Sequence, residues 1–153
     1  MNEPYKLLVI DNDFHAYSTP NSLNLAIDLL RNEGKRWAYY LHLQTDGVKA
    51  LEQNGYNAVL IDNDFGEGMN SLDKIIQTFV SRVPIAYISA YTPEALRIQA
   101  RELCERGKTG IFPEEFERSG VILIRKPGRN ISKEISQEEL SISLAYFLRS
   151  ACS

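Results

Sequence analysis

The sequence predicts an α/β fold in which helices cover both faces of a doubly wound, five-stranded parallel sheet. Two observations support this. Five short apolar runs alternate with amphipathic helical patterns, which is typical of strand and helix units that build a parallel sheet. At 153 residues, the chain is also long enough for one domain with a full core and too short for two ordinary ones. Among the strand orders compatible with this pattern, we select 2-1-3-4-5.

The first unit joins a strand at residues 7–10 to a helix. Thr19 is suited to cap that helix, with Pro20 at its first position, where a missing N–H is tolerated. Apolar residues then recur at helical spacing until Gly34, which favours the helix end. The sequence therefore predicts a strand, a loop and a helix for this first unit.

The second and third units follow the same scheme. The aromatic run 37–43 is strand-like, and the segment 46–55 has the cap and spacing of a helix. A third strand at 57–61 precedes the polar loop 62–70, and apolar residues at helical spacing continue over 72–80. The loop lies where ligands bind in open parallel sheets.

The fourth strand is predicted over 84–88. Thr92 and Pro93 form a cap and first-turn pair, and the helix that follows is closed by Gly107. This unit repeats the pattern of the first.

The fifth strand is predicted over 121–125, and Ser136 with Glu139 makes a capping box for the last helix. The apolar positions of this helix are Leu140, Leu144, Phe147 and Leu148. The segment 107–120 is an unusually long insertion before the last strand. We expect it to contain a short amphipathic helix and to modify a partner surface. The alternative is a tolerated surface insertion, because a longer loop costs little extra closure entropy.

Composition excludes several classes of function. The net charge of −3 argues against a nucleic-acid partner. Cys104 and Cys152 are too few for a disulfide framework and fit a reducing compartment. The N-terminal residues do not resemble a signal peptide, and no segment has the run of apolar residues needed to span a membrane. We therefore expect a soluble cytoplasmic protein with no membrane contact.

Four of the apolar runs end at a side chain suited to phosphoryl chemistry. These side chains are Asp11, Asp62, Ser89 and Lys126. The carboxyl ends of parallel strands converge on one crevice, so we expect the four to meet there. Two neighbouring carboxylates favour a hard cation such as Mg²⁺, and a carboxylate can also attack a phosphoryl group while a lysine neutralises its oxygens.

The chain resembles the response-regulator receiver (CheY-like) family of two-component signalling, over nearly its whole length. The matching motifs, in order, are VIDND (9–13), TDGVKALE (45–52), VLID (59–62), ISA (88–90) and RKP (125–127). The resemblance implies a flavodoxin-like fold, phosphorylation at Asp62, a hydroxyl switch at Ser89 and a phosphate-pairing lysine at Lys126. It also implies a magnesium site made by Asp11, Asn12, Asp62 and the backbone carbonyl of Asp64.

The sequence departs from the family pattern at several positions. Asn12 stands where the family usually has a second acid, so weaker metal binding is expected unless Asp13 compensates. Leu123 replaces the usual aromatic switch on the last strand. These departures support an alternative, a pseudo-receiver that binds proteins without being phosphorylated.

A second alternative is an enzyme. Asp11 and Asp13 after a strand match the DxD nucleophile motif of haloacid-dehalogenase-like phosphatases. Such enzymes need an acidic metal-binding pair after the lysine, whereas the acids beyond Lys126 lie before or within a helix start. This interpretation also leaves Asp62 without a role.

We interpret residues 1–153 as a single, non-enzymatic receiver domain acting in a phosphorelay. A histidine kinase or a phosphotransfer protein would phosphorylate Asp62. Output would come through a downstream protein partner or through self-association.

Overall fold

The computed structural model describes the chain over seven ranges. These are residues 3–11, 19–42, 49–50, 55–62, 83–107, 120–127 and 136–152. Within them lies a five-stranded sheet with the order β2-β1-β3-β4-β5 and four parallel pairings. The predicted sheet type and strand order are therefore confirmed.

The five strands lie within one or two residues of their predicted ends. They are β1 (Tyr5–Ile10), β2 (Trp37–His42), β3 (Ala58–Asp62), β4 (Ile85–Ser89) and β5 (Ile122–Arg125). Every residue of β3 and β4 is buried, as expected for central strands covered on both faces.

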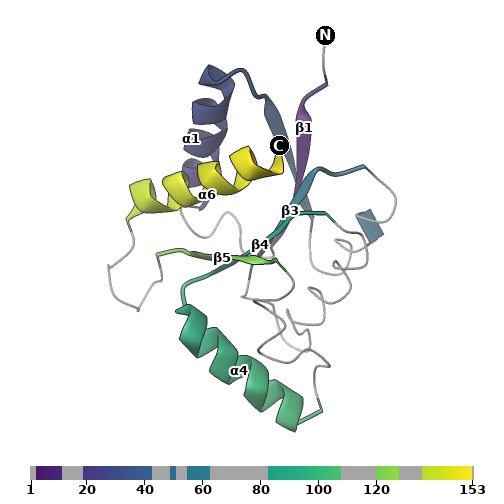
Figure 1. Cartoon of the computed structure of the whole chain (residues 1–153), viewed down its shortest axis with the longest axis vertical. Helices are drawn as coiled ribbons and strands as arrows, with labels where there is room; N and C mark the ends of the chain where they lie inside the picture. Colours follow the sequence, from purple (N-terminus) through teal and green to yellow (C-terminus); the bar gives the residue numbers. More distant parts are fainter. Residues whose placement is uncertain are drawn as a thin grey trace.

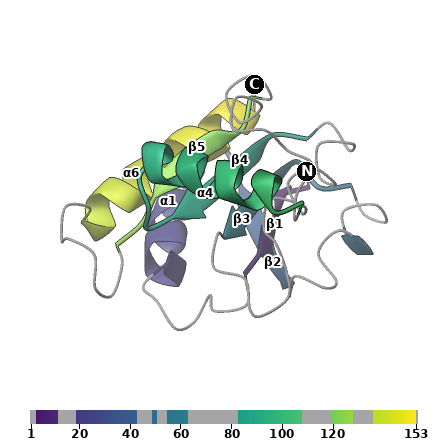
Figure 2. The ribbon, with the colours of Figure 1, turned by 90° about the horizontal axis from the view of Figure 1, so that it is seen from below.

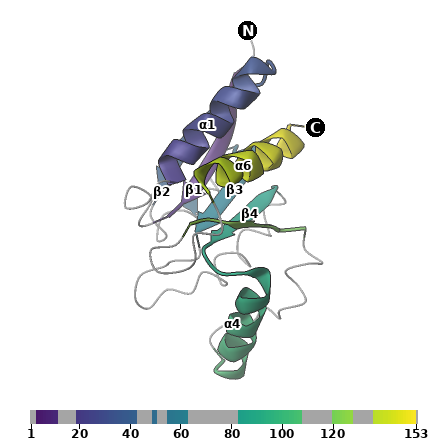
Figure 3. The same cartoon turned by 90° about the vertical axis from the view of Figure 1, so that its left-hand side faces the viewer.

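Among the described residues, three helices with both ends defined lie on the two faces of this sheet. They are α1 (Thr19–Asn32), α4 (Pro93–Glu105) and α6 (Gln137–Ala151). Helices α1 and α6 lie together on one face, and α4 lies on the other (Figures 1 and 3). Figure 2 views the molecule from below, with α4 in front of the sheet. This arrangement confirms the prediction of helices on both faces.

Alternate residues of β1, β3, β4 and β5 pack into two separate cores. Leu7 and Val9 of β1 join the core beneath α1 and α6. Leu8 and Ile10 join the core on the opposite face, which also contains Leu96 of α4. Because side chains alternate along a strand, a continuous apolar run supplies both cores at once.

Two of the predicted helix starts have the expected caps. Thr92 Oγ1 accepts a hydrogen bond of 3.1 Å from the Ala95 N–H, and Ser136 Oγ accepts one of 3.1 Å from the Glu139 N–H. At the other end of a helix, Gly34 adopts a φ of 82°, a conformation that glycine tolerates best.

The start of α1 differs by one residue from the prediction. Thr19 is the first helical residue rather than the cap before it, and Pro20 is therefore the second. Proline remains tolerated here, because the first four N–H groups of a helix have no partner within it.

Some predicted features lie outside the described residues. They are most of the helix at 46–55, the loop that follows Asp62, the helix at 72–80 and the core of the insertion at 108–119.

Candidate functional site

Four polar side chains lie at the carboxyl edge of the sheet. Asp62 and Ser89 are the last residues of β3 and β4. Asp11 follows β1 directly, and Lys126 follows β5 directly. Because all the strands run in the same direction, these four residues lie at the same edge, where ligands bind in sheets of this type.

The strand register makes Asp11 and Asp62 neighbours. Ile10 pairs with Ile61, so the next position along each strand is an aspartate. Adjacent strands lie about 4.8 Å apart. The Asp11 N–H also donates to the carbonyl oxygen of His42 at 3.2 Å, which continues the ladder between β1 and β2 to this residue.

Lys126 reaches Asp62 across the end of β4. The Lys126 Nζ donates to Asp62 Oδ2 in a buried ion pair between residues 64 positions apart in the sequence. Strands β3 and β5 are two strand spacings apart, about 10 Å. A lysine side chain is long enough to span this gap, and Lys126 therefore connects the central strand β3 to the outermost strand β5.

Ser89 lies between these two residues on β4. Its carbonyl oxygen accepts from the Lys126 N–H at 2.9 Å, which holds the start of the loop after β5 beside β4. Its Oγ accepts from the Tyr91 N–H at 3.0 Å. This hydrogen bond from the Tyr91 N–H was not predicted from the sequence, although a serine side chain often accepts from the backbone N–H two residues later.

Burial distinguishes this edge from the rest of the described chain. The exposed fractions of Asp11, Asp62 and Lys126 are 3%, 1% and 6%. Within the described ranges these are the only buried charged residues. Because burying charge opposes folding unless the charge is well paired, such a cluster indicates a site with a function.

The donor atoms at this edge suit a hard cation. Asp11 and Asp62 provide carboxylate oxygens, the ligand type that Mg²⁺ prefers. Asn12 and Asp64, the other implied ligands, and Asp13 lie outside the described residues. Over the ranges that are described, no cluster of three or more His, Cys, Asp or Glu side chains has metal-binding geometry.

Two further side chains, those of His42 and Tyr91, lie at this end of the sheet. His42 ends β2 with a half-buried side chain, and its contact with Asp11 is through its backbone. Tyr91 is 49% exposed and therefore lies at the surface.

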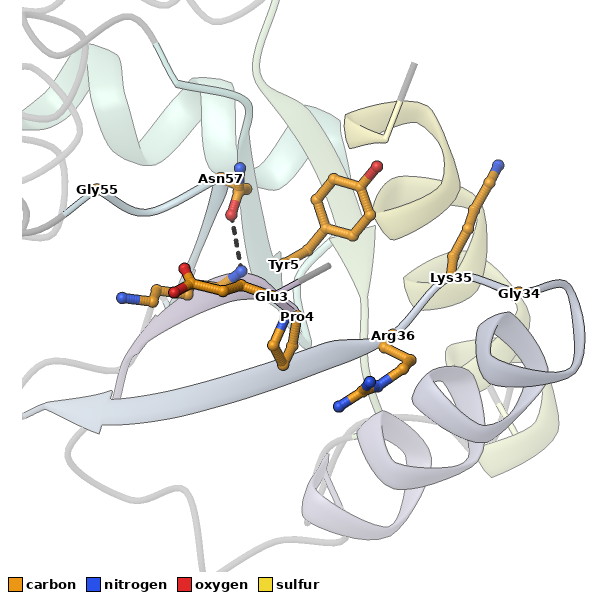
Figure 4. Close-up of a pocket in the computed structure, with 9 residues that line it drawn as sticks. Glu3, Pro4, Tyr5, Gly34, Lys35, Arg36, Gly55 and Asn57 are labelled. Carbon is orange, nitrogen blue, oxygen red and sulfur yellow. Dashed lines mark hydrogen bonds between the residues drawn. The ribbon is translucent and has the colours of Figure 1, made fainter. Parts of the chain in front are cut away.

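A cavity of about 630 Å³ lies at the opposite, amino end of the strands. It is lined by Tyr5, Lys35, Arg36, Asn57 and neighbouring residues (Figure 4). Lys35 and Arg36 point in different directions in this view, so their charges do not converge on one ligand position. The Oδ1 atom of Asn57 accepts from the backbone of β1 at 2.8 Å.

Comparisons with known proteins identify the fold. No family model matches the sequence, and a search of curated proteins found no match. Solved structures, however, match nearly the whole chain. A response regulator receiver protein from Sinorhizobium medicae WSM419 is 14% identical, with a TM-score of 0.51, over 97% of this chain and 98% of the other.

Two further solved structures match the same fold. The receiver domain of the Francisella response regulator 1452 is 16% identical, with a TM-score of 0.51, and covers 97% of this chain and 98% of its own. The N-terminal domain of a response regulator/sensory box/GGDEF protein from Carboxydothermus hydrogenoformans is 18% identical, with a TM-score of 0.56, over 95% and 94%.

The protein therefore has the fold of response-regulator receiver domains, as the sequence motifs predicted. In the described part of the chain, no helix is long and apolar enough to cross a membrane.

Proposed function

We propose that this protein is a receiver that accepts a phosphoryl group on Asp62 and signals in the cytoplasm by binding other proteins. The donor would be a phosphohistidine on a histidine kinase or a phosphotransfer protein. The observation that carries the proposal is the buried Asp62–Lys126 ion pair, with a second carboxylate, Asp11, on the adjacent strand.

The chemistry is a phosphoryl transfer between two side chains. A carboxylate oxygen of Asp62 attacks phosphorus, the new O–P bond forms an acyl phosphate, and the P–N bond to the donor imidazole breaks. The leaving imidazole takes up a proton. Lys126 already holds its ammonium group against the Asp62 carboxylate, so it can stay close to the incoming phosphoryl oxygens and compensate their charge.

The other residues at the edge have supporting roles. Asp11 and Asp62, with Asn12 and the Asp64 carbonyl, would hold Mg²⁺, which supplies positive charge to the phosphoryl oxygens when it is bound. Ser89 lies at the end of the intervening strand, where its hydroxyl can donate a hydrogen bond to a phosphoryl oxygen while its Oγ accepts from the Tyr91 N–H.

The alternatives make different predictions for the same measurements. A pseudo-receiver would give no phosphoryl adduct at any Mg²⁺ concentration. A phosphatase using Asp11 and Asp13 would turn over a phosphate ester continuously and would not depend on Asp62. A receiver gives a stoichiometric adduct on Asp62 and no sustained turnover.

Intact-mass measurement tests the proposal. Wild-type protein incubated with Mg²⁺ and phosphoramidate should gain the mass of one phosphoryl group, and Asp62→Asn should gain none. Asp28→Asn, which changes an exposed aspartate on α1, is the matched control and should be phosphorylated like the wild type. An equal adduct in Asp62→Asn would show that the phosphoacceptor is another residue.

A further inference from the structure

The outer face of α6 carries two exposed apolar side chains between two opposite charges. Ile142 and Tyr146 are 63% and 65% exposed, the highest values among large apolar residues in the described ranges. Glu138 precedes this pair by one turn, and Arg149 follows it by about one turn. The core requires neither apolar side chain.

These four residues form one stripe along the helix. At about 100° per residue, positions 138, 142, 146 and 149 fall within an arc of about 80°. The buried positions of α6 are Leu140, Ser141, Leu144, Ala145, Phe147 and Leu148. Helix α6 therefore carries two apolar side chains on a face that neither the sheet nor α1 covers.

The order of the stripe is self-complementary. Along α6 it runs acid, apolar, apolar, base. An antiparallel copy presents the reverse order, which sets Ile142 opposite Tyr146 and Glu138 opposite Arg149, each pair occurring twice about a twofold axis. A parallel copy would instead place like charges opposite one another.

We infer that the outer face of α6 binds the same face of a second copy of this chain, antiparallel, to form a symmetric homodimer. This surface is separate from the carboxyl edge of the sheet, and the inference does not depend on the proposed phosphorylation.

Two neighbouring features fit the same interface. Arg149 binds Glu33 through Nε and Nη2, at 2.9 and 2.7 Å, and a guanidinium has five N–H donors, so it can also bind Glu138 of a second copy. Helix α1 lies beside α6 (Figures 1 and 3) and exposes its own apolar pair, Leu25 and Leu29, one turn apart.

The dimer should be weak. Helix α6 has 15 residues, a length of about 22 Å. A standard stable interface buries about 1,600 Å² in total, more than one pair of helices covers. We therefore expect a dissociation constant on the order of 100 µM, which requires measurements up to about 1 mM protein.

Sedimentation equilibrium provides the first test. Wild-type protein should dimerise with increasing concentration, and Ile142→Glu and Tyr146→Glu should each weaken the dimer by at least about tenfold. Ile98→Glu is the matched control, because Ile98 on α4 is 53% exposed and lies outside the stripe. It should dimerise like the wild type, and circular dichroism should show that all variants are folded.

Charge exchange separates the dimer contact from the bond within the chain. Arg149→Glu should weaken dimerisation by placing two acids opposite each other. The double variant Glu138→Arg/Arg149→Glu should recover it, because the exchanged charges attract again between copies. The exchange does not restore the bond to Glu33, so recovery cannot come from that bond.

Disulfide trapping tests the antiparallel orientation. In a background of Cys104→Ser and Cys152→Ser, an Ile142→Cys protein should crosslink to a Tyr146→Cys protein more readily than either crosslinks to itself. Preferential self-crosslinking of Ile142→Cys would overturn the antiparallel arrangement. A monomer at about 1 mM, or a dimer unaffected by Ile142→Glu and Tyr146→Glu, would overturn the whole inference. Asp62→Asn should dimerise normally, so failure of the proposed phosphorylation leaves this test intact.

Discussion

At the scale of single residues, three charged side chains decide the chemistry of the carboxyl edge. Asp11, Asp62 and Lys126 are almost fully buried, and they carry two negative charges against one positive charge. The ion pair offsets part of the cost of burial, and two carboxylates on adjacent strands favour a hard cation at the same edge.

Removing the lysine should destabilise the domain. Lys126→Met keeps most of the side-chain volume but removes the ammonium group that pairs with the buried Asp62 carboxylate, which should lower the free energy of unfolding by about 3–5 kcal/mol. Urea unfolding at neutral pH measures the change.

The double variant Asp62→Asn/Lys126→Met is the control. It should be more stable than Lys126→Met alone, because the buried charge is removed together with its partner. A loss below about 0.5 kcal/mol in Lys126→Met would show that water screens this pair.

A surface pair should give stability a distinct pH dependence. The hydrogen bond from Arg149 lowers the pKa of Glu33 below its usual value. The folded state therefore favours the ionised form. This contribution to stability is complete above the unfolded-state pKa and is lost as the pH falls through the folded-state pKa.

Glu33→Gln should therefore be less stable than the wild type at neutral pH and equally stable in acid below the lowered pKa. Urea midpoints across this pH range, at dilute protein, measure the difference. Glu102→Gln, on the exposed surface of α4, should not reproduce this pattern. A deficit that persists in acid would mean that Glu33 acts through packing rather than charge.

At the scale of elements, local hydrogen bonds define where the helices begin. Ser136 caps α6 by accepting from the Glu139 N–H, and its backbone is extended, with φ −83° and ψ 164°. The side chain satisfies one of the N–H groups that have no partner in the first turn.

Loss of this cap should destabilise the domain measurably. Ser136→Ala should lower the free energy of unfolding by about 1 kcal/mol, whereas Ser136→Gly should lower it by only a few tenths. Ser143→Ala, on the exposed side of α6, should be neutral or slightly stabilising because alanine favours helices. Thermal unfolding measures all three, and equal effects of Ser136→Ala and Ser143→Ala would contradict the capping role.

At the scale of the whole molecule, the sheet holds two cores together. Phe147 is 1% exposed and lies in the core beneath α1 and α6, while Tyr87 is fully buried in the core on the other face. Strands β1, β3, β4 and β5 have side chains in both cores, so loss of packing on one face affects the position of the carboxyl edge.

Two adjacent aromatic residues on α6 should respond very differently to truncation. Phe147→Ala should lower the free energy of unfolding by about 3–5 kcal/mol, because it leaves a cavity in a close-packed core. Tyr146→Ala should change it by less than about 0.5 kcal/mol at concentrations where the protein is monomeric. Comparable losses in the two variants would contradict the orientation of α6.

The sequence by itself determined the strands, the helices that the structure describes and their caps. Ser136 and Thr92 identified two helix starts because capping depends on residues three positions apart. Continuous apolar runs identified the buried strands. The predicted start of α1 was wrong by one residue, because local sequence signals define a helix end only to within about one or two residues.

Only the tertiary structure decided which side chains meet. The sequence places Asp62 and Lys126 at two strand ends, but their ion pair depends on strand order and register across β4. In the same way, the helical pattern of α6 includes Ile142 and Tyr146 with the apolar residues, and only packing against the sheet separates the buried face from the exposed one. Local patterns arise from neighbours within one or two turns, whereas contacts between distant residues arise from how the layers pack.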